Sequence, residues 1–494
     1  MISLQNKISP NATYKVAFAI CLSFVAPILL ANNYYYDDVA RSLSGGLGWS
    51  QLGRPLSDAI FMVMSLNFRN SVDITPLPLI ISTIVMSHGI VLLCKLFFEK
   101  KTILNLLICS SVFFTPFFIQ NLSYRYDNLS MVASVYLCIW AVVLCKEKSL
   151  TNNLLSCLSL IFSLALYQTS FPSFCILCMG YVVMLAMKNR EGYFCFLIRA
   201  ISVTTLSLAI YYIAASIFFD QTSRSNLIFN QQDWLGLLYR NIKNYLLMLK
   251  VGLSPVGLFA AKSSLMIATA SCFYVACSRE FIYNRIEKVL FCIAVIFLPT
   301  FAVILSSLIS SVTIEGFMVP RVASSFGCSI FLCLFFISLS GARVISSALC
   351  LTLLFNSLLS FYVVTSSIKN QHIKDMLVIN RVASLISGDD HLRQVPVTFV
   401  GSLKPEMSAV NNSQIFGIAG LISSPFNDWM SALTLKKLSG VLVNYRMDRS
   451  GNQELANRIL QSNDARIYCN SDFTVVSDGV QSVVLLGIKI GKCI

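Results

Sequence analysis

The chain has 494 residues, of which 56% are hydrophobic and only 12% are charged, and its mean hydropathy is +0.72. Soluble proteins carry about 25% charged residues, so this composition excludes an ordinary soluble protein and indicates a polytopic membrane protein. The formal net charge of +14 comes mostly from the apolar part of the chain, where basic loops set membrane orientation, and it requires no nucleic-acid partner.

Apolar runs of about 17–25 residues, long enough to cross a bilayer as helices, occur about eleven times up to Ser366. After Ser366 the hydropathy falls and the chain has the composition of a soluble protein. We therefore predict a mainly α fold, with a transmembrane domain over residues 1–366 and a small α/β domain over residues 367–494. The predicted spans are 14–31, 75–98, 102–120, 128–145, 151–168, 170–187, 200–219, 254–277, 289–310, 322–340 and 344–366.

The first apolar run, which ends at Ala31, has the basic start of a secretory signal. Asn32 and Asn33 make a poor cleavage site, so we expect an uncleaved first helix. Short turns such as "FFEKK", "CKEKS" and "SGAR" are basic and should face the cytoplasm. This orientation places the N-terminus in the cytoplasm, and an odd number of spans then exports the C-terminal domain.

Two external segments, 32–74 and 220–253, are too long to be turns. In the first, "PLSDAIFMVMSL" (55–66) has helical periodicity with a proline at its start. In the second, "FNQQDWLGLLYRNIKNYLLMLK" alternates polar and apolar faces and carries Trp234 and Tyr239. Both patterns predict helices along the membrane surface.

The C-terminal domain shows patterns of both helix and strand. "NQHIKDMLVINRVASLIS" (370–387) and "NQELANRILQS" (452–462) predict helices, and "QVPVTFVG" (394–401) predicts a strand. "FTVVSDGVQSVVLLGI" predicts a hairpin that turns at Asp478-Gly479.

The 17 cysteines fall into two groups. Those in or beside the spans are expected to be small apolar residues. Cys469 and Cys493, in the C-terminal domain, can form a disulfide on an oxidising side of the membrane, although spacing alone leaves the pairing open.

Acids, arginines and glycines concentrate in "NNYYYDDVARSLSGGLGWSQLGRPLSD" (32–58), directly after the first span. These residues could have no functional role, since tyrosines gather at membrane interfaces and an Asp and Arg four positions apart form a weak surface pair. The density of such residues, with glycines that let backbone approach a ligand, favours a binding site instead. The candidate residues are Asp37, Asp38, Arg41, Trp49 and Arg54.

Three shorter external turns add further candidates. "SYRYDNLSM" (123–131) contains Arg125 and Asp127, although Asp127 alone is consistent with a helix cap. "YQTSFP" (167–172) contains Gln168 but no charge, which favours a structural role. "EGFMVPRV" (315–322) contains Arg321. A lone arginine near a membrane often has no functional role and only extends its charged end into the water.

The chemistry of these residues suits one class of reaction. Arginine holds phosphate in a bidentate grip, and a carboxylate can act as general base on a sugar hydroxyl. These are the needs of an enzyme that takes a sugar from a lipid-linked phosphate and passes it to an alcohol. No Walker loop or HExxH motif is present, and "CILC" (175–178) lies within a span, so we expect no metal and no cofactor.

"YYYDDVARSLSGGLGWSQLGRPL", "YRYDNLSM", "YQTSFP" and "VPRV", in this order among the spans, resemble a known family. The sequence is similar to the multispan bacterial and phage O-antigen glucosyltransferases, the serotype-converting enzymes of the lipid-donor (type C) class. The resemblance covers residues 1–366 well and the C-terminal domain only in general layout.

The resemblance implies glucosyl transfer from undecaprenyl-phosphate glucose to lipid-linked O-antigen, with inversion, on the periplasmic face of a bacterial inner membrane. The transmembrane domain would be catalytic, and an aspartate of the first external loop, Asp38 in preference to Asp37, would be the general base. The C-terminal domain would be periplasmic and fits acceptor recognition. Residues implied around the donor phosphate or the acceptor sugar are Arg41, Arg54, Arg125, Asp127 and Arg321.

Other functions stay open from sequence alone. A lipid-donor transferase of the same class can carry another sugar, such as aminoarabinose or mannose. A lipid-linked sugar flippase or transporter usually has charges or broken helices near the midplane and internal repeats. In this chain no repeat is visible and the spans are nearly free of charge, Lys262 excepted. An O-antigen polymerase is disfavoured only by the order of the motifs.

Overall fold

The computed structural model describes residues 7–188, 190–218, 226–278, 285–462 and 464–488. The chain divides into two compact units. The first comprises Met1–Leu30, Leu47–Tyr362 and Phe416–Ile418, and the second comprises Ala31–Gly46, Val363–Ile415 and Ala419–Ile494.

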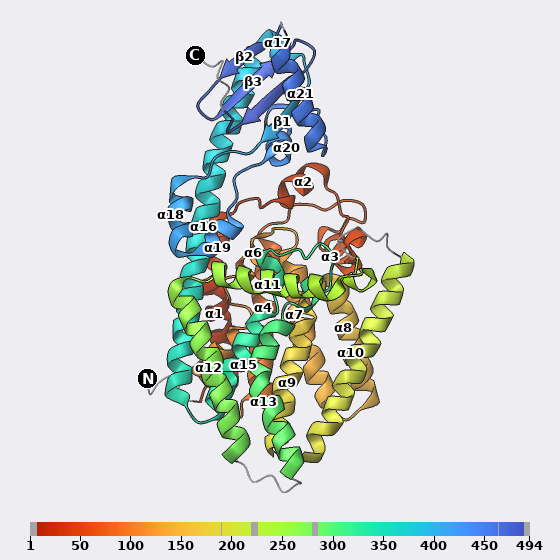
Figure 1. Ribbon diagram of the computed structural model, residues 1–494, viewed down its shortest axis with the longest axis vertical. Coiled ribbons are helices and arrows are strands. Elements are labelled where there is room, and N and C mark those ends of the chain that lie inside the picture. Colours follow the sequence, from red (N-terminus) through yellow and green to blue (C-terminus); the bar gives the residue numbers. More distant parts are fainter. Residues whose placement is uncertain (1–6, 189, 219–225, 279–284, 463, 489–494) are drawn as a thin grey trace. The chain divides into compact units, whose positions relative to one another are not determined.

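Long apolar helices dominate the first unit (Figure 1). Helices form because a bilayer offers no partner for backbone N–H and C=O groups, so these groups must pair within the segment. In the described part of the chain, eight helical segments are long and apolar enough to cross a membrane, and the predicted number of about eleven is not confirmed. These segments are Pro10–Ala31, Leu77–Phe97, Asn128–Lys146, Gln168–Ala186, Gly192–Phe218, Pro255–Cys277, Pro320–Leu339 and Arg343–Gly388.

Three of the predicted spans differ from this set. The run 102–120 is not one helix, because α5 (Ile103–Ser110) and α6 (Phe118–Ser123) are separated by non-helical backbone. Pro116 lies in that break, where it lacks a donor and disfavours helix in the preceding residue. For the runs 151–168 and 289–310, the apolar helices Leu150–Leu166 and Cys292–Leu305 are shorter than the eight.

Helices occur in both segments predicted to lie along the membrane surface, as α3 (Pro55–Ser65) and α11 (Trp234–Gly252). Proline occupies the first turn of α3, where its missing N–H costs nothing. The Asp233 side chain caps α11 by accepting from the Gly236 N–H at 3.1 Å. Within this unit α11 runs roughly perpendicular to the long helices, as expected for a helix along a membrane surface (Figure 1).

The other helices of the first unit follow in chain order. They are α1 (Pro10–Ala31), α4 (Leu77–Phe97), α7 (Asn128–Lys146), α8 (Leu150–Leu166), α9 (Pro172–Lys188), α10 (Arg190–Phe218), α12 (Pro255–Ser278), α13 (Arg285–Leu305), α14 (Leu308–Ser311) and α15 (Phe326–Leu339), with 3-10 turns η2 (Ser50–Leu52), η3 (Gln168–Ser170), η5 (Ile228–Asn230) and η6 (Pro320–Ala323).

Helix α16 (Arg343–Gly388) contains both the last predicted span and the predicted helix 370–387. Its 46 residues are continuous, and its part from Val363 onward belongs to the second unit. The sequence contains no glycine or proline between Arg343 and Ser387, so nothing in the backbone ends the helix earlier.

The second unit contains a four-stranded sheet in the order β1-β4-β3-β2. β3 (Phe473–Ser477) and β4 (Ser482–Leu486) form the predicted hairpin. Gly479 has φ 81°, and the Asp478 side chain accepts from the Val480 and Gln481 N–H groups. The outer strands are β1 (Val397–Gly401), parallel to β4, and β2 (Arg466–Cys469), antiparallel to β3.

Both faces of this sheet are buried. Val397 and Phe399 pack on one face with α16 and α20 (Asp428–Ser439), and Val400 packs on the other with α21 (Arg449–Gln461). Such alternation is the period of a strand. The remaining helices of this unit are α2 (Asp37–Ser44), α17 (Asp390–Arg393), α18 (Met407–Ile415) and, mostly, α19 (Gly417–Ile422).

Cys469, at the end of β2, is disulfide-bonded. Its predicted partner, Cys493, lies outside the described residues. The other cysteines of the described chain are not in disulfides.

Candidate functional site

Arg54 lies directly before α3, and its guanidinium contacts residues from a distant turn. The central carbon of the guanidinium lies 4.4 Å from the centre of the Tyr167 ring. Nε donates a hydrogen bond to Oε1 of Gln168 at 3.1 Å. Burial lowers the pKa of Arg54 from its ordinary value, although Tyr167 and Asp127 oppose this effect. The side chain nevertheless stays cationic at neutral pH, because the ordinary value is so high.

Gln168 and Tyr211 hold the backbone next to Arg54 in place. The Gln168 Nε2 donates to the carbonyl oxygens of Leu52 and Gly53, at 2.9 and 3.2 Å. The Tyr211 hydroxyl donates to the Gly53 carbonyl at 2.7 Å. Gly53 has φ 72°, and a Cβ at this position would lie only 2.8 Å from the Tyr211 hydroxyl oxygen. Only glycine fits this close approach without strain.

Arg321, in η6, is anchored through its backbone and aims its side chain at an aromatic ring. Its N–H donates to Oε1 of Gln120 at 2.8 Å, and its carbonyl accepts from the Tyr167 hydroxyl at 3.2 Å. The guanidinium lies 5.1 Å from the centre of the Tyr124 ring and donates to the Tyr124 hydroxyl. Tyr167 therefore contacts the Arg54 side chain with its ring and the Arg321 backbone with its hydroxyl.

Asp127 completes this cluster. Its charge raises the pKa of Arg54, whereas the charge of Arg321 lowers it, so both side chains lie within electrostatic reach of Arg54. Asp127 is only 5% exposed and occupies the N-cap position of α7, yet its side chain makes no capping hydrogen bond. Two guanidiniums and one carboxylate leave an excess positive charge, which suits an anionic ligand such as phosphate.

Arg125, from the same turn as Asp127, forms a different pair. Its Nη1 lies 3.1 Å from Oδ2 of Asp73, and its side chain is 12% exposed. Asp73 belongs to the first long segment between spans. A ligand that bound Arg125 would therefore share it with Asp73 or displace this carboxylate.

Trp49 and Asp58 organise the glycine-rich loop that precedes Arg54. The Asp58 carboxylate accepts from the backbone N–H groups of Gly48, Trp49 and Ser50. Trp49 is fully buried, and its ring stacks on Phe61 with 5.2 Å between centroids. The structure thus gives Trp49, predicted as a binding residue, a packing position in this loop.

The remaining candidates, Asp37, Asp38 and Arg41, lie on α2 in the second unit. Asp38 is 1% exposed, and its Oδ2 accepts from the Tyr35 N–H at 3.0 Å. Asp37, the first residue of α2, is half-buried. Arg41 donates to the Gly46 carbonyl at 3.4 Å, close to the end of the helix.

Tyr35 and Tyr36 tie α2 to the rest of the second unit. The Tyr35 hydroxyl donates to the Ile422 carbonyl at 3.1 Å, and Tyr36 packs against the core beside the sheet. Tyr36 also has φ 47°, a conformation that side chains rarely adopt and that is often found near functional sites. Tyr35 and Tyr36 therefore contribute to the packing of the second unit.

Sequence reasoning missed several neighbours of the arginines. Tyr124 and Tyr167 lie inside motifs that the sequence singled out, whereas Gln120 and Tyr211 lie in apolar runs with no distinguishing signal. No group of three metal-binding side chains occurs among the residues that the structure describes.

The apolar helices and their connecting turns define a polytopic, mostly helical membrane protein. Residues 26–335 match the family model described as "Glucosyl transferase GtrII", and the chain belongs to that family. Membership supports a glycosyltransferase, and the match includes every residue discussed above as a candidate.

A relative in Salmonella phage P22 is described as an "Uncharacterized 55.3 kDa protein in gtrB 5'region". The two sequences are 32% identical over 177 residues, which is 36% of each chain. The match thus spans about a third of the relative's length.

Proposed function

We propose that the protein transfers glucose from undecaprenyl-phosphate glucose to a hydroxyl group of lipid-linked O-antigen on the periplasmic side of a bacterial inner membrane. The observation that carries the proposal is the cluster of Arg54, Arg321 and Asp127 in a member of the glucosyl transferase family. A polyprenyl phosphate is an anion at the membrane surface, and paired guanidiniums are well suited to hold it.

In the proposed reaction, the acceptor oxygen forms a bond to the anomeric carbon of glucose while the bond from that carbon to the phosphate oxygen breaks. The acceptor proton passes to a carboxylate, and the phosphate leaves with both electrons of the broken bond. Attack opposite the leaving group inverts the anomeric centre. Arg54 and Arg321 stabilise the charge that develops on the phosphate, so no metal ion is required for this purpose.

Asp37 and Asp38 are the candidates for the carboxylate that accepts the proton. Asp38 is almost fully buried and accepts a backbone hydrogen bond, whereas Asp37 is half-buried. A base must come within hydrogen-bond reach of the acceptor hydroxyl. This requirement favours Asp37 as the base, with Asp38 fixing the start of α2.

The remaining candidates are given supporting roles. Gln168 positions Arg54 through the Nε contact, and Asp127 offsets part of the positive charge of the two guanidiniums. Arg125, paired with Asp73, and Arg41 are proposed to contact sugar or phosphate oxygens. Trp49 supports the glycine-rich loop through its packing on Phe61.

The test uses purified protein reconstituted in liposomes with radiolabelled polyprenyl-phosphate glucose and lipid-linked O-antigen. Removing a general base costs roughly 10²–10⁴-fold in rate, so Asp37→Asn should lower the transfer rate by this factor with binding of the donor unchanged. Asp233→Asn, at the cap of α11, is the matched control and should transfer normally. Normal transfer by both Asp37→Asn and Asp38→Asn would remove the role given to this helix.

A further inference from the structure

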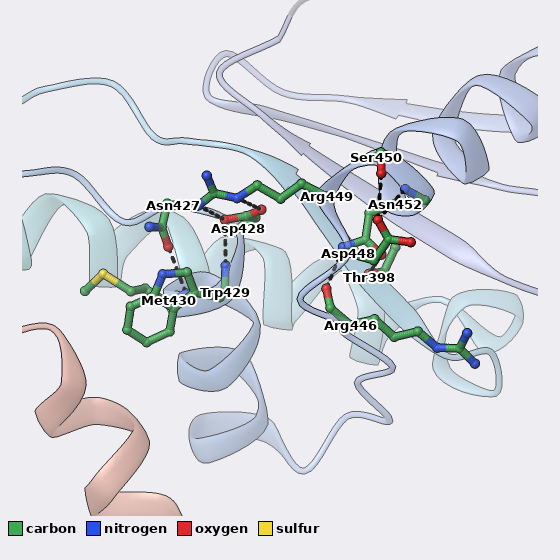
Figure 2. Close-up of polar contacts among 11 residues, drawn as sticks. Thr398, Asn427, Asp428, Trp429, Met430, Arg446, Asp448, Arg449, Ser450 and Asn452 are labelled. Atoms are coloured by element: carbon green, nitrogen blue, oxygen red, sulfur yellow. Dashed lines mark hydrogen bonds and ion pairs between the residues drawn. The ribbon is translucent and has the colours of Figure 1, made fainter. Parts of the chain in front are cut away.

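The second unit contains a pocket at the carboxyl end of β1. Its volume is about 320 Å³, which lies at the lower end of the range of about 300–1,000 Å³ for small-molecule sites. The chain turns at this edge, and α20 and α21 both begin beside it (Figure 2). Six of the residues that line the pocket are Gly401, Ser402, Asn427, Asp428, Arg449 and Asn452.

A bidentate pair of opposite charges forms the polar wall. Nε and Nη2 of Arg449 lie 3.1 and 3.2 Å from the two carboxylate oxygens of Asp428 (Figure 2). Asp428 is 4% exposed, whereas the Arg449 side chain is 68% exposed. The carboxylate is therefore fixed inside the protein, and the guanidinium remains accessible at the mouth of the pocket.

The charge of this wall disfavours an anion. The Asp428 carboxylate neutralises Arg449, and three N–H groups in the first turns of α20 and α21 already donate to capping side chains. Asn427 accepts from the Met430 N–H at 3.1 Å, Asp428 from its neighbour's N–H, and Asp448 from the Gly451 N–H at 3.0 Å. A phosphate would have to displace these bonds and approach a buried carboxylate.

A sugar ring matches the same wall. Each hydroxyl group both donates and accepts a hydrogen bond. The Asp428 carboxylate accepts, the Arg449 guanidinium donates, and the Asn427 and Asn452 amides do both. Asn452 is 7% exposed, and its Nδ2 donates to the Arg446 carbonyl at 2.9 Å, which fixes its orientation. Ile488 adds an apolar edge to the lining.

We infer that this pocket binds an uncharged pyranose ring of the acceptor glycan, with Asp428 and Arg449 as its principal hydrogen-bonding groups. The inference rests on the proposed function only in naming the acceptor as the source of the ring. The pocket lies wholly within the second unit, so binding of the sugar is measurable without any transfer reaction.

The experiment measures binding by saturation-transfer NMR to the full chain in lipid nanodiscs. The probes are methyl glycosides of a hexose, a 6-deoxyhexose and an N-acetylhexosamine, with inorganic phosphate as competitor. At least one glycoside should bind the wild type, and phosphate should not displace it. Loss of a charge-assisted hydrogen bond weakens binding about tenfold or more, so Arg449→Gln and Asp428→Asn should each show this loss.

Arg458→Gln, on the same helix but outside the lining, is the matched control and should bind as the wild type does. If the Asp428→Asn protein unfolds, the Arg449→Gln protein alone tests the assignment. The Arg449 side chain is mostly exposed, so its replacement should leave the fold intact. Absence of glycoside binding, displacement by phosphate or unchanged binding by Arg449→Gln would each overturn the assignment. A wild type that binds the glycoside but transfers no glucose would refute the proposed function and leave the pocket assignment standing.

Discussion

Arg54 and Arg321 come from distant turns, yet the Arg54 side chain and the Arg321 carbonyl both contact Tyr167. If the two guanidiniums hold the donor phosphate, a lysine at position 54 keeps the charge but loses the planar, bidentate geometry. Such a loss costs roughly 1.5–3 kcal/mol, so Arg54→Lys should raise KM for the lipid-linked donor about tenfold to a hundredfold. Initial rates against donor concentration measure this change. Arg240→Lys, exposed on α11, should leave KM unaltered, and an unaltered KM in Arg54→Lys would exclude the phosphate contact.

At the residue scale, sequence located the charged members of the cluster because charge is rare in this chain. Arg54, Asp127 and Arg321 are conspicuous among apolar neighbours for this reason. Tyr211 and Gln120 are not conspicuous in the sequence, because their roles depend on hydrogen bonds that form only in the folded protein. Trp49 was predicted to bind a ligand but is buried, because the residue type alone does not reveal whether an aromatic ring is exposed.

At the element scale, the turn before α3 depends on a single glycine. Gly53 has φ 72° and lies against Tyr211 and Gln168. Alanine at this position should cost about 1–3 kcal/mol in conformational strain and displace the backbone that carries Arg54. Gly53→Ala should therefore lower transfer and the melting temperature together. Gly46→Ala, where φ is not left-handed, is the control expected to change less. A Gly53→Ala protein with normal activity and melting temperature would contradict this role.

Cys469, in the second unit, is disulfide-bonded. Removing a native disulfide typically costs about 2–5 kcal/mol, so Cys469→Ser should lower the thermal stability of that unit. Thermal unfolding of the full chain, with and without reductant, measures this effect. Cys195→Ser, which removes an exposed free cysteine, should not change the unfolding curve. Equal curves for the wild type and Cys469→Ser would show that the bond adds no stability.

Elements with strong local signals were predictable, and those defined by tertiary contacts were not. The Asp478-Gly479 turn specified the hairpin, and the periodicity of 55–66 and 229–250 specified α3 and α11. Hydropathy alone predicted one span over the residues that form α5 and α6, and this prediction was wrong because Pro116 lies between the two helices. The parallel pairing of β1 with β4 joins strands far apart in sequence, and no local pattern encodes such a pairing.

At the scale of the whole molecule, transfer on the periplasmic side requires the C-terminal domain to face the periplasm. The basic turns predict this orientation through the positive-inside rule. A reporter that is active only after export, fused after Ile494, should be active, and the same reporter fused after Lys101 should be silent. The opposite pattern would reverse the topology and place the arginine cluster on the cytoplasmic side.

The central claim, glucosyl transfer from a polyprenyl-phosphate donor, is tested most directly by a comparison of donors. Purified protein in liposomes with lipid-linked O-antigen receives radiolabelled glucose as polyprenyl-phosphate glucose, as UDP-glucose or as the polyprenyl phosphate of another hexose. We expect label to enter the O-antigen only from polyprenyl-phosphate glucose. Label transferred from UDP-glucose, or polyprenyl-phosphate glucose that crosses the membrane without being transferred, would contradict it.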